Sequence, residues 1–217
     1  MPLFEIKHRW NGSVLFSLEC GSMKLCVEAA VRAGADLRYT NLSSADLRYA
    51  NLSYADLRYA NLSYTNLSYA DLSYADLSYT NLSSADLRYA NLSYADLTKE
   101  QLVWFRDDIW AVLSSSPAEV LELREALMSG KVDGSTYEGD CCCLVGTLAN
   151  ARHCEYDQIP GLAPNSSRPA EQWFYGIKKG DTPETHRASK LALEWVDQWM
   201  GNMRAAFGAD LFTEGRA

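Results

Sequence analysis

Residues 35–67 read ADLRYTNLSSADLRYANLSYADLRYANLSYTNL, a pattern that restarts every five residues. A small residue, then Asp or Asn, then Leu recurs thirteen times in succession, ending at Leu97. A period of five fits neither the 3.6 residues per turn of an α-helix nor the two-residue alternation of a plain strand. Each unit is therefore interpreted as a very short strand followed by a turn, so that successive units bend around a shared interior.

The interior of this coil is predicted from the positions within one unit. The small residue and the Leu are two residues apart, so both point to the same side of a short strand, and the Asp or Asn between them points away. The predicted core leucines are Leu37, Leu42, Leu47, Leu52, Leu57, Leu62, Leu67, Leu72, Leu77, Leu82, Leu87, Leu92 and Leu97.

A longer repeat indicates how many sides the coil has. Residues 35–57 and 75–97 are identical at 22 of 23 positions, the exception being Arg38 against Ser78. The shift is 40 residues, or eight units, which equals two turns of a four-sided coil and no whole number of turns of a three-sided one. Simple gene duplication is an alternative explanation, so the shift favours four sides without requiring them.

The units ADLRY, ANLSY and TNLSS resemble the A(D/N)LXX consensus of the pentapeptide-repeat family, whose members form a right-handed quadrilateral β-helix. The resemblance implies a fold that is mainly a β solenoid plus α-helical parts, with about three coils over residues 35–97. FEIKHRWNGSVLFSLE and DGSTYEGDCCCLVGTLANAR are similar to the ends of pentapeptide-repeat proteins from bacteriophages and prophages. That second resemblance implies no established activity.

Residues 1–34 are predicted to form an N-terminal cap. Apolar residues alternate on both sides of Asn11-Gly12, a pair that favours a two-residue type I′ turn, so a β-hairpin is expected. SMKLCVEAAVRAG follows with helical composition, Ser22 as N-cap and Gly34 as its end. The alternating residues are Phe4, Ile6 and Trp10 before the turn and Val14, Phe16 and Leu18 after it.

Residues 98–217 are predicted to be an all-α domain. Thr98 is expected to cap a helix in which Leu102, Phe105, Ile109 and Leu113 fall at helical spacing. Ser116 to Glu119 reads as a capping box with Pro117 at the first helical position, and Gly130 as the end of that helix. RPAEQWFYGIKK is a third helix, and the segment DTPETHRASKLALEWVDQWMGNMRAAF gives the fourth and longest, with Asp181 or Thr182 as its cap.

Composition bounds the function. The net charge is −8, distributed as about +1, −3 and −6 over residues 1–34, 35–97 and 98–217, which argues against a basic nucleic-acid-binding face. The charged N-terminus and the lack of a long apolar run indicate neither a secretory signal nor a membrane span. A cytoplasmic location, in a bacterial cell or a phage-infected host, is therefore expected.

Stacking the coils places residues 20 apart above one another, at about 4.8 Å. Three outward columns of tyrosine result. They are interpreted either as structural elements that stiffen the coil or as a contact surface for a partner. The columns are Tyr39–Tyr59–Tyr79, Tyr49–Tyr69–Tyr89 and Tyr54–Tyr74–Tyr94, and the fourth is Ser44–Tyr64–Ser84.

A column of carboxylates, Asp36–Asp56–Asp76–Asp96, has the spacing to imitate a phosphate strand. Some pentapeptide-repeat proteins are implicated as DNA mimics that occupy the DNA-binding saddle of gyrase, so the resemblance allows that function here. Arg38 and Arg58 lie beside the column, and their positive charges weaken the DNA-mimic hypothesis. The alternative is that Asp has a structural role and, like Asn, hydrogen-bonds the turn backbone.

Cys141, Cys142, Cys143, His153 and Cys154 could supply metal ligands or a nucleophile, but the spacing of a zinc site is absent. They are read as small buried residues of a helix, and neither metal nor cofactor is expected. The leading hypothesis is a non-enzymatic binding protein, monomeric or homodimeric, with a protein partner. The alternatives are a gyrase-directed DNA mimic, a self-assembling solenoid, and an enzyme whose activity resides in residues 98–217.

Overall fold

The structure is a computed structural model that describes residues 1–136, 143–159, 162, 164–165 and 168–208. The chain divides into two compact units, Met1–Leu102 and Val103–Ala217. Each unit is described by itself below. The finer division of the chain at residues 34 and 97 stays a prediction.

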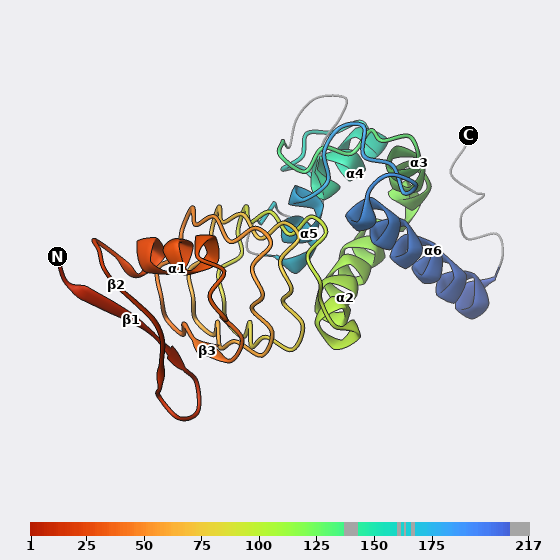
Figure 1. Ribbon diagram of the computed structural model, residues 1–217. Coiled ribbons are helices and arrows are strands. Elements are labelled where there is room, and N and C mark those ends of the chain that lie inside the picture. Colours follow the sequence, from red (N-terminus) through yellow and green to blue (C-terminus); the bar gives the residue numbers. More distant parts are fainter. Residues whose placement is uncertain (137–142, 160–161, 163, 166–167, 209–217) are drawn as a thin grey trace. The chain divides into compact units, whose positions relative to one another are not determined.

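The repeat block of the first unit is a β-solenoid (Figure 1). Parallel bridges join residues 20 positions apart, from Asn41 with Asn61 to Asp76 with Asp96, so one turn of the coil contains four pentapeptides. Successive turns exchange backbone hydrogen bonds of 2.8–3.1 Å, as when Leu67 donates to the carbonyl of Asp86. This confirms the solenoid that the five-residue period predicts.

The leucines lie inside the coil. All thirteen predicted core leucines are buried except Leu82, which is half-buried in the last turn. The threonines at the small position are accommodated because their hydroxyls find backbone acceptors. Thr40, for example, donates to the carbonyl of Leu37 at 2.9 Å, so its burial leaves no unpaired hydroxyl.

The N-terminal hairpin consists of β1 (Leu3–His8) and β2 (Val14–Glu19), and α1 (Met23–Arg32) follows. The hydroxyl of Ser22 accepts a hydrogen bond from the Leu25 amide, as predicted for the N-cap. The two-residue turn at Asn11-Gly12 is wrong. Five residues link the strands, because the Asn11 side chain accepts hydrogen bonds from the Ser13 amide and hydroxyl and only Gly12 has positive φ.

The cap is joined to the first turn of the solenoid. Strand β1 pairs antiparallel with the short β3 (Thr40–Asn41), so the sheet order is β2-β1-β3. The Glu28 carboxylate of α1 accepts a hydrogen bond of 2.9 Å from the backbone amide of Asn51. Strand pairing and a helix side chain thus satisfy backbone groups that a first coil would otherwise expose.

The start of α2 closes the last turn. Thr98 and Gln101 form a capping box, in which each side chain bonds the other residue's amide. The same Gln101 amide group donates to the carbonyls of Leu77 and Thr80 at 3.0 and 3.2 Å. One side chain therefore begins the helix and pairs with the end of the coil.

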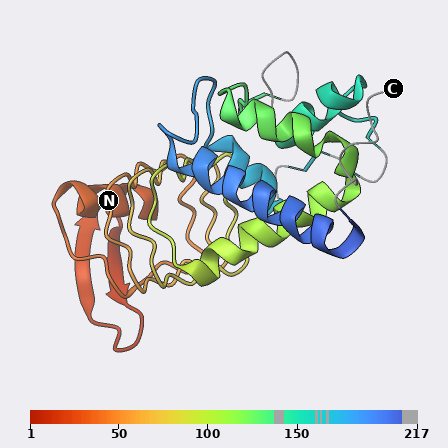
Figure 2. The ribbon, with the colours of Figure 1, turned by 90° about the vertical axis from the view of Figure 1, so that its right-hand side faces the viewer.

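The described elements of residues 99–208 are helices (Figure 2). They are α2 (Lys99–Ser115), the 3-10 turn η1 (Pro117–Glu119), α3 (Val120–Met128), α4 (Leu144–Arg152), α5 (Pro169–Tyr175) and α6 (Arg187–Phe207). Their core contains Phe105, Trp173 and Trp195. The ring centroid of Trp173 lies 5.1 Å from that of Phe105 and 4.9 Å from that of Trp195. Gly130, with φ of +65°, follows α3 as predicted.

Two predicted caps are wrong. The Ser116 side chain makes no cap hydrogen bond, because the Glu119 amide donates to the carbonyl of Ser116 instead, at 3.3 Å. The Glu119 carboxylate, the other half of the predicted capping box, pairs with Arg152 at 2.7 Å. Helix α6 begins after His186 and not after Asp181 or Thr182. Those two residues stabilise a preceding turn, in which Asp181 accepts from the Lys178 amide and the carbonyl of Thr182 accepts from the His186 amide.

Candidate binding surface

The turn of each pentapeptide projects one side chain at the corner of the coil. In residues 46–50, the Asp46 carboxylate accepts from the Arg48 amide and the Ala50 amide bonds the carbonyl of Leu47. The residue before Ala50, Tyr49, has φ of +58°, the backbone sign of a type II turn. The equivalent Tyr or Ser has φ of +56 to +61° in every turn from Tyr39 to Tyr94.

This geometry was not apparent in the sequence, because tyrosine at positive φ is uncommon. Hydrogen bonds on both sides hold the strained residue in place. The Tyr49 amide, for example, donates to the carbonyl of Ser68 in the next coil at 3.1 Å. The corner side chains are therefore fixed in direction by the backbone before any side-chain packing is considered.

The tyrosines of three corners are stacked. Ring centroids of neighbours in a column are 4.7–4.9 Å apart and the rings are inclined by 2–19°. Exposed fractions remain large, with Tyr54 at 73% and Tyr74 at 48%. The stack hides the ring faces from solvent and leaves the ring edges and hydroxyls for contact.

One column continues beyond the repeats. The Trp10 ring lies 5.1 Å from that of Tyr39 and 5.7 Å from that of His8, and Trp10 is 72% exposed. The Arg9 side chain donates to the carbonyl of Tyr59 at 2.6 Å, which fixes the hairpin loop against the coil. Trp10 lies beyond the strand in which the alternating pattern placed it, and an aromatic residue next to a turn was the one sequence signal of this extension.

Two arginines offset half of the four negative charges of the aspartate column. Arg38 makes two hydrogen bonds to Asp36, and Arg58 makes two to Asp56. Arg58 also lies 3.4 Å from Asp76 in the following coil. The hydrogen bonds from Arg38 lower the pKa of Asp36 to about 2. The carboxylates of Asp36, Asp56 and Asp76 also accept hydrogen bonds from turn amides, as the alternative reading proposed.

A second column has the same ion pairs. Asp46 pairs with Arg48 and Asp86 with Arg88, at 2.7 and 2.6 Å. Between the two arginines lies Ser68, which is only 5% exposed. Its hydroxyl bonds Asn66 at 2.7 Å, so the position is packed even though it is outside the leucine core.

The cysteine cluster lies partly outside the described residues, since these exclude Cys141 and Cys142. Cys143 is buried, as predicted. It precedes α4, however, so the prediction that it belongs to a helix is wrong. His153 follows α4 at φ of +58°. Within the described residues, no group of three or more His, Cys, Asp or Glu side chains could hold a metal ion.

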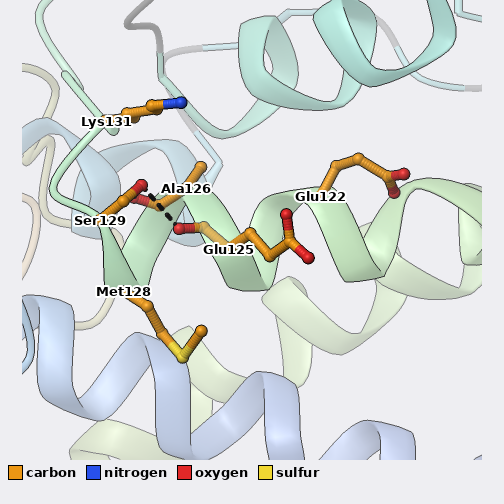
Figure 3. A pocket seen from close by; sticks show the side chains of 6 residues that line it. All are labelled: Glu122, Glu125, Ala126, Met128, Ser129 and Lys131. Carbon is orange, nitrogen blue, oxygen red and sulfur yellow. Dashed lines mark hydrogen bonds between the residues drawn. The ribbon is translucent and has the colours of Figure 1, made fainter.

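A surface hollow of about 500 Å³ lies along α3 in the second unit (Figure 3). Glu122, Glu125 and Lys131 supply its charges, and the Ser129 hydroxyl donates to the carbonyl of Glu125 at 2.7 Å. Figure 3 shows Lys131 and Glu122 toward opposite ends of the hollow. Its charged groups are spread along the helix and do not gather around one point.

The solenoid and its columns of corner residues define a repeat protein with a rigid outer surface. Residues 33–63 and 65–99 match the model of the pentapeptide-repeat family, in eight copies. The repeat block thus consists of pentapeptide repeats. No match was found among curated proteins.

Three solved structures have similar repeats. A pentapeptide repeat protein from the thylakoid lumen of Arabidopsis thaliana is 38% identical over 30% of this chain and 44% of its own, with a TM-score of 0.29. Rfr23 from the cyanobacterium Cyanothece 51142 is 36% identical over 29% and 42%, with a TM-score of 0.19. HetL from Nostoc sp. strain PCC 7120, a protein involved in heterocyst differentiation regulation, is 46% identical over 29% and 34%, with a TM-score of 0.16.

The chain spans less than half the length of these three proteins, and the TM-scores are too low to compare overall shapes. The likeness to phage proteins is not shown, since the three come from a plant and two cyanobacteria. The predicted cytoplasmic location is overturned by the thylakoid-lumen protein, because these repeats also occur outside the cytoplasm. None of the described helices is both long enough and apolar enough to span a membrane.

Proposed function

We propose that this chain is a non-enzymatic binding protein in which a solenoid of about three coils presents its tyrosine columns to a protein partner. The observation that carries the proposal is the set of three stacked, solvent-exposed columns on one scaffold. Tyrosine supplies a large amphipathic contact area and loses little side-chain entropy on binding. Stacking fixes the rings before the partner arrives, which lowers the entropic cost of association further.

The charges on the solenoid support a partner that is recognised by aromatic and hydrogen-bonding contacts. Arg38, Arg48, Arg58 and Arg88 are each paired with an aspartate two residues away. Direct nucleic-acid binding is not proposed, because those arginines are not available as a basic patch. Binding to the tyrosine columns should therefore depend little on salt.

The other functions have weaker support. A gyrase-directed DNA mimic needs an unbroken line of negative charge, and Arg38 and Arg58 neutralise half of it. An enzyme in residues 98–217 needs converging groups, whereas the hollow along α3 spreads its charges. A self-assembling solenoid needs open ends, but the first coil pairs with β1 and the last with Gln101.

The test compares two variants in affinity capture from a lysate of the cells that make the protein. In the first, Tyr49, Tyr54, Tyr69 and Tyr74 are replaced by serine, which the repeat already accepts at positive φ in Ser44 and Ser84. The matched control is Tyr64→Ser, which changes a tyrosine of the fourth, unstacked column. A partner retained by the control and lost by the four-residue variant supports the proposal. Equal retention by both folded variants contradicts it.

A further inference from the structure

Two cysteines lie side by side where β2 leads into α1 (Figure 1). Cys20 directly follows β2, and Cys26 belongs to the first half of α1. The carbonyl of Ser22 accepts a hydrogen bond of 3.2 Å from the Cys20 thiol and another of 3.2 Å from the Cys26 amide. This shared acceptor brings the two cysteines together at the junction of the hairpin and the helix.

The two thiols are in contact with each other. Burial raises the pKa of the Cys26 thiol, and the adjacent Cys20 thiol raises it further, both by its charge when ionised and by a side-chain hydrogen bond. The Cys26 thiol also donates to the carbonyl of Phe4 in β1, at 3.6 Å. A disulfide forms without backbone movement only when the two sulfurs already lie close together. The hydrogen bond between the side chains meets this condition.

We propose that Cys20 and Cys26 are an oxidation site, at which hydrogen peroxide forms a disulfide that fastens α1 to the hairpin. The Cys20 thiolate attacks one peroxide oxygen, which gives a sulfenic acid and releases hydroxide. The Cys26 thiolate then attacks the Cys20 sulfur and displaces the sulfenic oxygen as a second hydroxide. The two protons that the thiols lost convert both hydroxides to water, so two thiols and one peroxide give one disulfide and two waters.

Burial decides both the oxidant and the order of the two thiols. Cys20 is 6% exposed and Cys26 is fully buried, so a bulky oxidant such as oxidised glutathione has little access. Hydrogen peroxide is little larger than water. It reaches Cys20 first, and Cys26 is the thiol that resolves the sulfenic acid. The oxidation should be slow, because an enclosed thiol ionises reluctantly.

The disulfide strengthens the cap of the solenoid. Strand β1 pairs with β3, and Glu28 of α1 accepts a hydrogen bond from the Asn51 amide, so the hairpin and the helix are each attached to the first coil. A covalent link between them restricts the unfolded chain. The oxidised cap should therefore resist unfolding better than the reduced one.

The test treats the folded full chain with hydrogen peroxide, alkylates the remaining thiols and digests the product with trypsin. Trypsin cleaves after Lys24, between the two cysteines, so the disulfide joins peptides 10–24 and 25–32. Mass spectrometry should show one cross-linked species that separates into these two peptides on reduction. Cys26→Ser should lose the cross-link and accumulate a sulfenic acid on Cys20 that dimedone traps. Cys154→Ser, which changes a half-buried cysteine outside the pair, is the matched control and should keep the cross-link.

Thermal unfolding measures the effect on the cap. Dithiothreitol reduces a disulfide but not an oxidised methionine, so the midpoint before and after its addition isolates the disulfide. The peroxide-treated chain and Cys154→Ser should each unfold at a midpoint roughly 5 °C higher before dithiothreitol than after it. Cys26→Ser should show no such difference, and Cys26→Ala serves in its place if the serine variant does not fold.

Three results overturn the proposal. The first is a folded, peroxide-treated chain in which the two peptides remain unlinked or in which Cys20 is linked to another cysteine. The second is a cross-link that forms only after the chain is denatured. The third is a cross-linked chain whose unfolding midpoint does not change when the disulfide is reduced.

Discussion

At the scale of single residues, Leu67 is the centre of the solenoid interior. It is fully buried, and so are Leu47 and Leu87, which lie 20 residues before and after it. Leu82 has the same place in its pentapeptide but belongs to the last turn and is half-buried. The two leucines therefore separate the effect of burial from that of residue type.

Leu67→Ala should lower the free energy of unfolding by roughly 2 to 5 kcal/mol, because it removes buried methyl groups and leaves a cavity between two coils. Leu82→Ala should lower it clearly less, because water already reaches that site. Chemical denaturation of both variants measures the difference. Equal losses would show that the stability contributed by these leucines does not depend on how deeply each one is buried.

The tyrosine stacks contribute to stability as well as to the surface. Tyr74 lies 4.8 Å from both Tyr54 and Tyr94, whereas the column neighbours of Tyr64 are serines. Tyr74→Ser should thus cost roughly 1 to 3 kcal/mol more than Tyr64→Ser, at about 0.5 to 1.5 kcal/mol per aromatic pair. Thermal unfolding compares them at the same backbone strain. A matching loss in the two variants would assign the stacks no energetic role.

At the scale of elements, Gln101 connects the solenoid to the helix that follows it. Its side chain accepts from the Thr98 amide and donates to two carbonyls and the Thr80 hydroxyl of the coil. A coil end and a helix start each expose unpaired backbone groups, and here one amide side chain satisfies both.

Gln101→Ala should cost roughly 1 to 3 kcal/mol, more than a surface cap alone, because it leaves the carbonyls of Leu77 and Thr80 without this donor. Lys99→Ala is the control, since Lys99 is exposed in the same turn and should change stability by less than about 0.5 kcal/mol. Denaturant titration measures both. An equal, small effect would mean that water replaces the glutamine without penalty.

The sequence was sufficient for elements with a strict pattern. The five-residue period gave the solenoid, and Ser22 and Thr98 gave helix starts that the structure confirms. The sequence was insufficient where a residue distant in the chain takes the place of a local hydrogen-bond partner. The predicted capping box at Ser116 does not form, and the Glu119 carboxylate pairs instead with Arg152, 33 residues away. For the candidate surface, the columns followed from the period, but positive φ at tyrosine and the Trp10 extension required the three-dimensional fold.

At the scale of the whole molecule, the ion pairs of the solenoid link its stability to pH. Hydrogen bonds from the neighbouring arginine lower the pKa of Asp36, Asp46, Asp56 and Asp86. A carboxyl whose pKa is lower in the folded chain stabilises it fully above its ordinary pKa of about 3.9. That stabilisation is lost as the pH falls toward the folded pKa, which is about 2 for Asp36.

The free energy of unfolding should therefore fall between about pH 5 and pH 2, and only slightly, because solvent screens these exposed pairs. Replacing Arg48 and Arg88 with serine, the residue that stands at the equivalent Ser68, removes the main cause of the shift for Asp46 and Asp86. This variant should lose less stability over the same range, and added salt should narrow its difference from the unmodified chain. Denaturant titrations at several pH values provide the measurement. Identical pH profiles would mean that the arginines neutralise the columns without stabilising the fold.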